Sequence, residues 1–272
     1  MSSLLGAAHR VLSRQPLVVA LVLKLRNQCH RIIQCRLEDT ANSAVNGEER
    51  WIQSIAPHCQ TFVDVGANVG HWSAAFCQAM PAQGQGLLFE PAVGAHQILQ
   101  QRFADDPRIE TVAAALSDTV GTAQFYEEPN AGETSSLVAQ HSQGQAQVRW
   151  VPVTTLDRAI AERGWERVDF VKIDAEGYDF QVLRGAQHLL QHQKIGSLQF
   201  EYNAPWALVG STLGAALNFL QGFGYQTFLL KAAGLHRFDY AKYGEFFGYA
   251  NFVAVSPALW PMVEPSIQTL WP

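Results

Sequence analysis

Apolar and polar positions follow two periodicities, one typical of strands and one of helices, which alternate along the chain from about residue 60 onward. Short apolar runs of the kind that form buried strands read TFVDV, GLLFE, ETVAAAL, VDFVKID, SLQFEY and QTFLLK. Stretches with helical spacing separate them, at residues 72–80, 92–103, 178–192 and 213–223. The alternation predicts an α/β fold in which right-handed crossovers connect the parallel strands of a doubly wound sheet.

Three segments depart from this alternation. After Asp118, TVGTAQFYEEPNAGETSSL and QVRWVPVTTLD are extended segments around glycine turns and show no helical period, which predicts antiparallel additions or a loop near the functional site. Near the end, QTFLLK and YANFVAVS flank a predicted loop at residues 235–249, so we expect a closing hairpin with one antiparallel strand. Asp157 follows VTT and is expected to cap a helix rather than to bind a ligand.

The composition describes a chain that can bury a full core. With 272 residues, 48% of them apolar, we expect one catalytic domain at residues 46–272 behind a helical extension at residues 1–45. The net charge is −5 and the basic residues are scattered, which argues against nucleic acid as a partner and favours a small or neutral substrate. Oligomeric state is not indicated by the sequence.

The four cysteines, Cys29, Cys35, Cys59 and Cys77, show neither a CxxC motif nor zinc-finger spacing. They are expected to be free thiols in a reducing compartment, which makes the cytoplasm the predicted location.

An apolar run near the N-terminus, PLVVALVLKL, follows Arg10 and Arg14. Lys24 and Arg26 interrupt it well short of the roughly 20 apolar residues that a spanning helix needs, and no small-residue cleavage site follows. We expect no transmembrane span but a helix that packs on the domain or on a partner. Peripheral contact with a membrane is the alternative.

Polar residues stand at the carboxyl ends of the predicted strands. Ligands of a doubly wound sheet bind beyond those ends, at the point where the strand order reverses. We therefore expect the functional site to include residues at these positions: Asp64, Glu90, Ser117 with Asp118, Asp174 with Glu176, and Glu201.

The stretch FVDVGANVGHW predicts a ligand loop between a strand and a helix, because Gly66 and Gly70 allow sharp turns and close approach. A dinucleotide fingerprint requires GxGxxG, and Asn68 stands where the second glycine belongs. S-adenosylmethionine instead presents cationic groups and a ribose diol, which carboxylates such as Asp64 and Glu90 would bind. A nicotinamide-dependent oxidoreductase with Glu90 on the ribose remains the alternative.

The ordered motifs VDVGANVGHWS, LLFEP, AALSD, SSL, VTTLD and VDFVKIDAEGYDFQVLRGA resemble the FkbM-type family of S-adenosylmethionine-dependent methyltransferases, from about residue 46 to residue 228. The resemblance implies a class I methyltransferase fold, which is a Rossmann-like, mostly parallel sheet with an antiparallel last strand. It also implies S-adenosyl-L-methionine as cofactor and methyl transfer to a hydroxyl of a sugar, another glycan or a secondary metabolite.

Cofactor roles carried over from the resemblance fall on the strand ends. The methionine end of the cofactor would meet the glycine loop and the ribose would meet Glu90, while Ser117 and Asp118 would hold the adenine edge. The loop residues are Asp64, Gly66, Asn68 and Gly70. Asp64 could instead brace the loop by accepting hydrogen bonds from the backbone N–H groups of the loop.

Asp174 is the expected general base, because it ends the fourth predicted strand next to where the methyl group should lie. Glu176 and Glu201 are the alternative catalytic residues, and a divalent cation shared by these acids is a further alternative, although no metal-ligand set is assigned. Asp174 or Glu176 could also cap the helix that begins near Gly177. Ser135 and Ser136 lie in a loop that could close over ligand or form a solvated turn. A non-catalytic methyltransferase-like scaffold is the last alternative.

Overall fold

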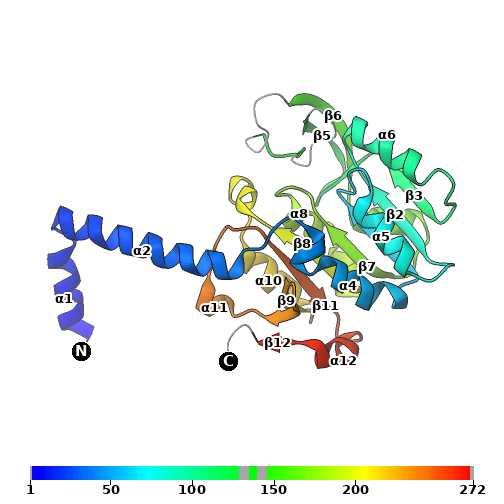
Figure 1. Cartoon of the computed structure of the whole chain (residues 1–272). Helices are drawn as coiled ribbons and strands as arrows, with labels where there is room; N and C mark the ends of the chain where they lie inside the picture. The colour runs from blue at the N-terminus through cyan, green and yellow to red at the C-terminus, as the bar shows by residue number, and fades with distance from the viewer. Residues whose placement is uncertain (1, 129–134, 140–145, 270–272) are drawn as a thin grey trace. The chain divides into compact units, whose positions relative to one another are not determined.

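The computed structural model describes residues 2–128, 135–139 and 146–269, and the chain divides into two compact units. The smaller unit, Met1–Glu38, contains helices α1 (Ser2–Leu12) and α2 (Pro16–Leu37) (Figure 1). Pro16 begins α2, where a missing N–H costs no intrahelical hydrogen bond. Within the described ranges, none of the helices combines the length and the apolarity that crossing a bilayer requires.

A nine-stranded sheet organises the described part of the larger unit, Asp39–Pro272, in the order β12-β10-β9-β11-β8-β7-β1-β2-β3. The bounds are β1 (Thr61–Val65), β2 (Gln85–Phe89), β3 (Ile109–Val112), β7 (Val168–Ile173), β8 (Ile195–Tyr202), β9 (Gln226–Lys231), β10 (Gly234–Arg237), β11 (Ala250–Val255) and β12 (Gln268–Thr269). The five strands from β3 to β8 are parallel, and β11 is antiparallel to both of its neighbours, β8 and β9. The predicted doubly wound, mostly parallel sheet is confirmed.

The antiparallel edge is larger than predicted. β9 and β11 pair as the expected hairpin, but the connection between them is not a plain loop: it contains strand β10, which pairs with β9, and helix α11 (Tyr240–Tyr243). The expectation of a simple loop at residues 235–249 was therefore wrong. Leu235 and His236 are buried.

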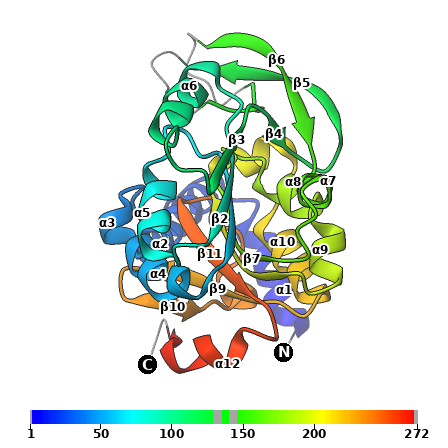
Figure 2. The ribbon, with the colours of Figure 1, turned by 90° about the vertical axis from the view of Figure 1, so that its right-hand side faces the viewer.

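Helices cover both faces of the sheet (Figure 2). One face packs on α4 (Glu48–Ile55), α5 (His71–Ala79) and α6 (Val93–Arg102). On the other face, α8 (Asp179–Arg184), η2 (Ala204–Val209) and α10 (Leu213–Gly222) stack aromatic rings near β8. The remaining helices are α3 (Ser43–Asn46), η1 (Ala56–His58), α7 (Leu156–Glu162), α9 (Gln187–Gln191), α12 (Trp260–Val263) and η3 (Glu264–Ser266).

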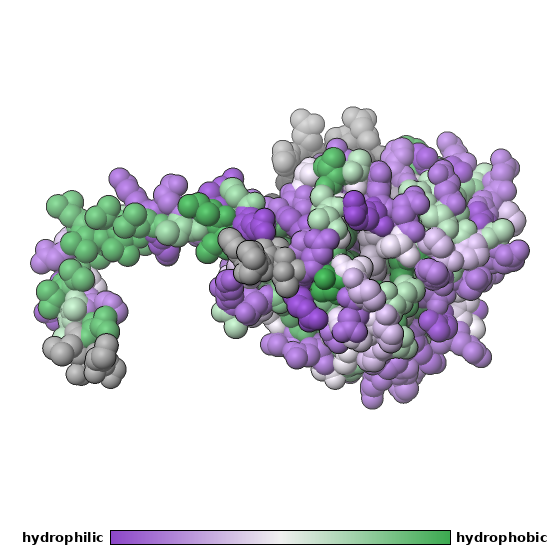
Figure 3. Space-filling view, turned by 60° about the horizontal axis from the view of Figure 1, so that its bottom comes forward, coloured by the Kyte–Doolittle hydropathy of each residue, from purple (hydrophilic) through white to green (hydrophobic). Residues whose placement is uncertain are grey.

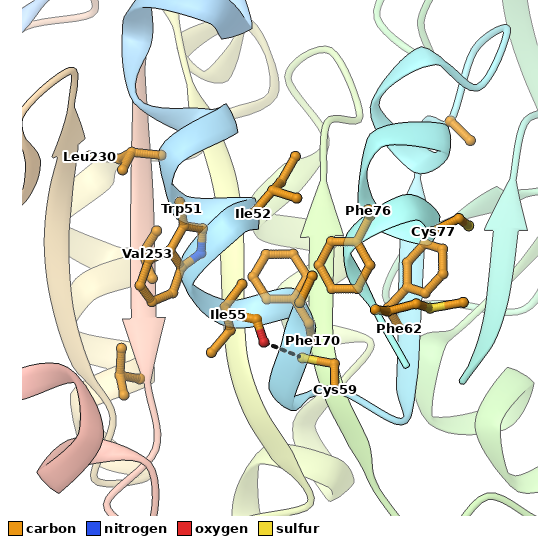
Figure 4. Packing of buried hydrophobic residues seen from close by; sticks show 14 of the residues in the cluster. Trp51, Ile52, Ile55, Cys59, Phe62, Phe76, Cys77, Phe170, Leu230 and Val253 are labelled. Atoms are coloured by element: carbon orange, nitrogen blue, oxygen red, sulfur yellow. Dashed lines mark hydrogen bonds between the residues drawn. The ribbon is translucent and has the colours of Figure 1, made fainter. Parts of the chain in front are cut away.

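The core between the sheet and α5 is an aromatic stack. Phe62 of β1 and Phe170 of β7 occupy the same register, and the ring of Phe76 lies 4.6 Å and 5.2 Å from their ring centroids. Trp72 stacks on Phe170 at 5.7 Å. Figure 4 shows the same face continuing to Trp51 on α4. These side chains anchor α4 and α5 above the strands whose ends carry the polar residues.

The cysteines form no disulfide in the described residues. Cys29 and Cys35 are exposed, while Cys59 and Cys77 are buried in the aromatic face, where burial raises the pKa of each thiol to about 12.

Two predicted elements are divided in the structure. The run ETVAAAL was expected as one strand, but β3 ends at Val112 and β4 (Ala115–Leu116) joins a second sheet in the order β4-β6-β5. The chain changes sheet at the exposed Ala113, and nothing in the run of small and β-branched residues marks this position. Strands β5 (Gly121–Glu127) and β6 (Gln147–Thr154) confirm the predicted antiparallel addition. Residues 129–134 and 140–145 of that prediction lie outside the described residues.

The predicted helix at residues 178–192 consists of α8 and α9 with a break at Gly185. A Cβ on Gly185 would lie 2.1 Å from the carbonyl oxygen of Ser117, so only glycine permits this contact between the helix end and the Ser117 segment.

Candidate functional site

The sheet face that carries the aromatic stack becomes charged at its carboxyl end. Asp64 follows Phe62 by two residues on β1, and Lys172 follows Phe170 by two residues on β7. The register pairs Asp64 with Lys172 and Lys172 with Gln199 of β8. Because residues in register point to the same face, the three polar side chains form one row across adjacent strands.

Lys172 is the centre of this row, and sequence reasoning missed it. Its Nζ lies 2.9 Å from Oδ2 of Asp174, 3.8 Å from Oδ1 of Asp64 and 5.6 Å from the ring centroid of Trp72. Burial alone would lower the pKa of Lys172, but the carboxylates of Asp174, Asp64 and Glu48 outweigh it and raise the pKa above its ordinary value. Lys172 is therefore a buried cation. The sequence feature that could have identified Lys172 is a lysine inside a predicted buried strand, two residues before an acid.

Asp64 has no exposed surface. Its carboxylate accepts a hydrogen bond from Ser73 Oγ and faces Lys172. Burial raises the pKa of Asp64, against the opposing effects of Lys172 and Ser73. These partners belong to the protein itself, and they agree with a bracing role for Asp64, through Ser73 of α5 and Lys172 rather than through backbone N–H groups.

The glycine loop lies against the loop that follows β7. Gly66 has a φ of 78°, and a Cβ there would lie 1.9 Å from the carbonyl oxygen of Asp174. The N–H of Asp174 donates to the carbonyl of Val65 over 2.9 Å. Gly70, with a φ of 82°, has a different reason: a Cβ would lie 2.7 Å from the side chain of Leu99, so its absence lets α6 pack on the loop.

Glu90 lies at the end of β2 and is almost fully buried. Its Oε2 accepts the N–H of Asn68 over 2.8 Å and its Oε1 accepts the N–H of Ala92 over 2.7 Å. Burial raises the pKa of Glu90 to about 7, although the two backbone hydrogen bonds act in the opposite direction. An ionised carboxylate has about four acceptor sites, so capacity remains for a ligand. Asn68 adopts a φ of 48°, and its side-chain oxygen is buried without a protein partner.

Acids also gather where β7 and β8 end. Asp179 is buried and its carboxylate accepts the N–H groups of Gly177 and Glu201, each over 3.3 Å. These N–H groups belong to the loop before α8 and to β8, so Asp179 fixes that loop against the sheet, while the N-cap residue Tyr178 makes no side-chain capping hydrogen bond. Burial raises the pKa of Asp179 and of Glu201 well above the ordinary range, and neighbouring carboxylates add to the effect. No group of three or more His, Cys, Asp or Glu residues in the described ranges is arranged to hold a metal ion.

Asp118 lies beside the loop after β7 rather than in the charged row. Its carboxylate pairs with Arg184 over 3.0 Å and accepts from Ser117 Oγ over 3.3 Å. Burial raises the pKa of Tyr178, and the charge of Asp118 contributes to that shift. Ser117 and Asp118 thus adjoin Tyr178, close to where Asp174 and Glu176 stand in the chain.

Ser136 is buried, so the alternative of a solvated turn was wrong. Its Oγ donates to the carbonyl of Glu176 over 2.7 Å, and its backbone pairs with Tyr126 of β5. Ser136 thereby ties the second sheet to the loop after β7. Glu176 has a φ of 49°, a conformation that few non-glycine residues adopt.

Asp157 was expected to be an N-cap, but it lies in the first turn of α7 (Leu156–Glu162) and instead contacts the start of α9. Its carboxylate accepts the N–H groups of His188 and Leu189 over 2.8 Å and 2.9 Å, while Thr155 caps α7 itself.

A second set of polar residues was missed because it combines the start of the larger unit with strands β8 and β11, which are distant in sequence. Glu48 of α4 accepts hydrogen bonds from Gln199 and from Asn46. Asn251 of β11 accepts from Gln199 over 3.3 Å. Oε1 of Gln199 and Nδ2 of Asn251 are buried without a hydrogen-bond partner within the protein. Such groups usually meet water or a ligand, so this polar interior extends the candidate site.

Comparison with known proteins gives one match to a family. A model of the Methyltransferase FkbM domain matches residues 64–227. No match was found among curated proteins.

Solved structures with a similar fold are distant. A putative caffeoyl-CoA O-methyltransferase from Staphylococcus aureus is 10% identical, with a TM-score of 0.42 over 93% of this chain and 98% of that chain. The O-methyltransferase from Bacillus cereus in complex with SAH is 12% identical, with a TM-score of 0.41 over 86% and 90% of the two chains.

The buried cation yields a prediction about stability. Replacing Lys172 with Met should lower the free energy of unfolding by about 3–5 kcal/mol, because Asp64 and Asp174 would lose their counter-charge inside the protein. Urea denaturation followed by circular dichroism measures the loss.

The matched control is Arg158→Met, which breaks the exposed pair with Glu162 and should cost less than about 1 kcal/mol. Adding Asp64→Asn to Lys172→Met should restore part of the loss. Equal effects of Lys172→Met and Arg158→Met would contradict the role given to Lys172.

Proposed function

Since this chain belongs to the FkbM methyltransferase family, we propose that it transfers a methyl group from S-adenosylmethionine to a hydroxyl oxygen of a small molecule or glycan. The observation that carries the cofactor assignment is Glu90. It is a buried carboxylate at the end of β2 whose protein hydrogen bonds leave acceptor capacity free.

The residues around Glu90 suit the chemistry of this cofactor. Gly66 keeps the loop after β1 free of a side chain where it meets Asp174, and Asn68 contributes a buried oxygen without a protein partner. Glu90 would accept hydrogen bonds from the ribose diol, and the glycine loop would hold the methionine end. Ser117 and Asp118 are proposed for the adenine edge. Bound there, S-adenosylmethionine would supply an electrophilic methyl group.

Asp174 is the proposed general base. Its side chain is 30% exposed, whereas Asp64, the other carboxylate beside Lys172, has no exposed surface, so Asp174 is the one that an acceptor can reach. Lys172 holds Oδ2 of Asp174 over 2.9 Å, which orients the carboxylate. Glu201 is buried and Glu176 stands two residues beyond Asp174, and both are kept as secondary candidates. The exposed thiols of Cys29 and Cys35 favour a reducing cytoplasm as the location.

Ligand binding tests the cofactor assignment. Isothermal titration should detect binding of S-adenosylmethionine and S-adenosylhomocysteine to the full chain. Glu90→Ala should abolish it, whereas Asp174→Asn should retain it. NADH is the comparison ligand. Binding of NADH without the sulfur ligands would favour an oxidoreductase, and binding of neither would favour a scaffold.

The pKa of Glu90 predicts how this affinity depends on pH. Because burial raises the pKa of Glu90 to about 7, its carboxylate becomes ionised as the pH rises through neutrality. Only the ionised form can accept two bonds from a ribose diol while it keeps those from Asn68 and Ala92. The affinity for S-adenosylhomocysteine should therefore increase about tenfold from about pH 6 to about pH 8.

Titrations at several pH values measure the profile, with Glu90→Gln as the control that should give a flat one. A flat profile in the unsubstituted protein would remove the ribose role from Glu90.

The rate of methyl transfer tests whether Asp174 is the general base. With an acceptor found by screening sugars and hydroxylated metabolites for release of S-adenosylhomocysteine, Asp174→Asn should lower kcat about 100-fold to 10,000-fold at unchanged cofactor affinity. Glu176→Gln serves as the comparison. If Glu176→Gln has the large effect and Asp174→Asn the small one, Glu176 is the base.

A further inference from the structure

The smaller unit has a charge opposite to that of the rest of the chain. The unit, residues 1–38, contains six of the 19 Lys and Arg residues and one of the 24 Asp and Glu residues, Glu38, which gives it a formal charge of +5. The remaining 13 basic and 23 acidic residues give residues 39–272 a formal charge of −10. The six basic side chains are exposed. A polyanionic surface is therefore the partner that this unit attracts.

Apolar side chains are exposed on the same unit. Within residues 17–25 of α2 Lys24 is the one polar residue, and Leu17 is 86% exposed. Figure 3 shows a hydrophobic surface, coloured green, along this part of the chain. The other large apolar residues exposed in this run are Val19, Leu21, Val22, Leu23 and Leu25.

The arrangement of these residues distinguishes between two kinds of partner. Seven consecutive apolar residues, 17–23, cover the whole circumference of a helix that turns every 3.6 residues or so. A partner helix, including one from a second copy of this chain, would bury one stripe and leave the opposite side in water. A lipid phase covers all sides at once.

We propose that the smaller unit binds the surface of an anionic lipid bilayer. The apolar side chains of residues 17–25 insert among the acyl chains, and the basic side chains within and beside this run contact the lipid phosphates. As a helix these nine residues span about 14 Å, less than half of the roughly 30 Å hydrocarbon layer, so the run does not cross it and lies at the boundary of one leaflet, which leaves Arg14 before the run at the headgroups too. Lys24, Arg26 and Arg31 then lie at the level of the headgroups, where long basic side chains keep their charge hydrated.

Flotation of the full chain with vesicles tests the proposal without reference to methyl transfer. Binding is compared between phosphatidylcholine vesicles and vesicles that also contain phosphatidylglycerol, and it should be strong only with the anionic ones and weaken in salt. The triple variant Lys24→Gln, Arg26→Gln and Arg31→Gln should bind about 100-fold more weakly, since each charge contributes about fivefold.

The apolar contribution is tested by Leu21→Gln with Leu25→Gln, which should weaken binding about tenfold for each residue. Glutamine is a good helix former, and circular dichroism verifies that the helix is retained.

Matched controls come from exposed positions of the larger unit. Val120→Gln with Val148→Gln is the apolar control, and Arg50→Gln with Arg158→Gln and Arg167→Gln is the charge control. Both should leave vesicle binding unchanged.

Three results would overturn the proposal. The first is no flotation with anionic vesicles, and the second is equal binding by the α2 variants and the controls. The third is a concentration-dependent dimer in light scattering that the α2 substitutions abolish, which would identify a second copy of the chain as the occupant.

Discussion

The buried cation of Lys172 is the interaction on which the carboxyl end of the sheet depends. Asp64 and Asp174 come from different strands, and Glu48 comes from a helix above them, yet all three act on the same ammonium group. Without a cation, acids buried side by side would repel each other and lack hydration. Lys172 therefore lets the protein fold with several carboxylates at the carboxyl end of the sheet. The ring face of Trp72 contacts the same cation.

The loops beyond the strands are held by backbone contacts rather than by side chains alone. Gly66 and Asp174 touch through main-chain atoms, and the N–H of Asp174 donates to Val65. Ser136 then connects the second sheet to the carbonyl of Glu176. Three segments distant in sequence are thus fixed against one another. A side chain at residue 66 would separate the first two, which explains why glycine stands there.

The sequence predicted features that depend on local periodicity and turn chemistry: the alternating elements, the glycine loop and the acids at strand ends. It did not predict features that depend on register. Lys172 meets Asp64 only because β1 and β7 are neighbours, and Glu48 meets Gln199 across 151 residues of chain. The division of ETVAAAL between two sheets was also not predicted, since the residues of the run do not indicate which strands they will pair with.

Two acids show why position at a strand end does not by itself assign a role. Asp64 and Glu90 both follow buried strand residues, and burial raises the pKa of both. Asp64 directs its carboxylate to Ser73 and Lys172, inside the protein, and has no exposed surface. Glu90 is held by two backbone N–H groups that fix its orientation and leave acceptor sites free. Both carboxylates therefore hold neighbouring segments of the protein, and the partners of a carboxylate have to be considered together with its place in the motif before a ligand role is proposed for it.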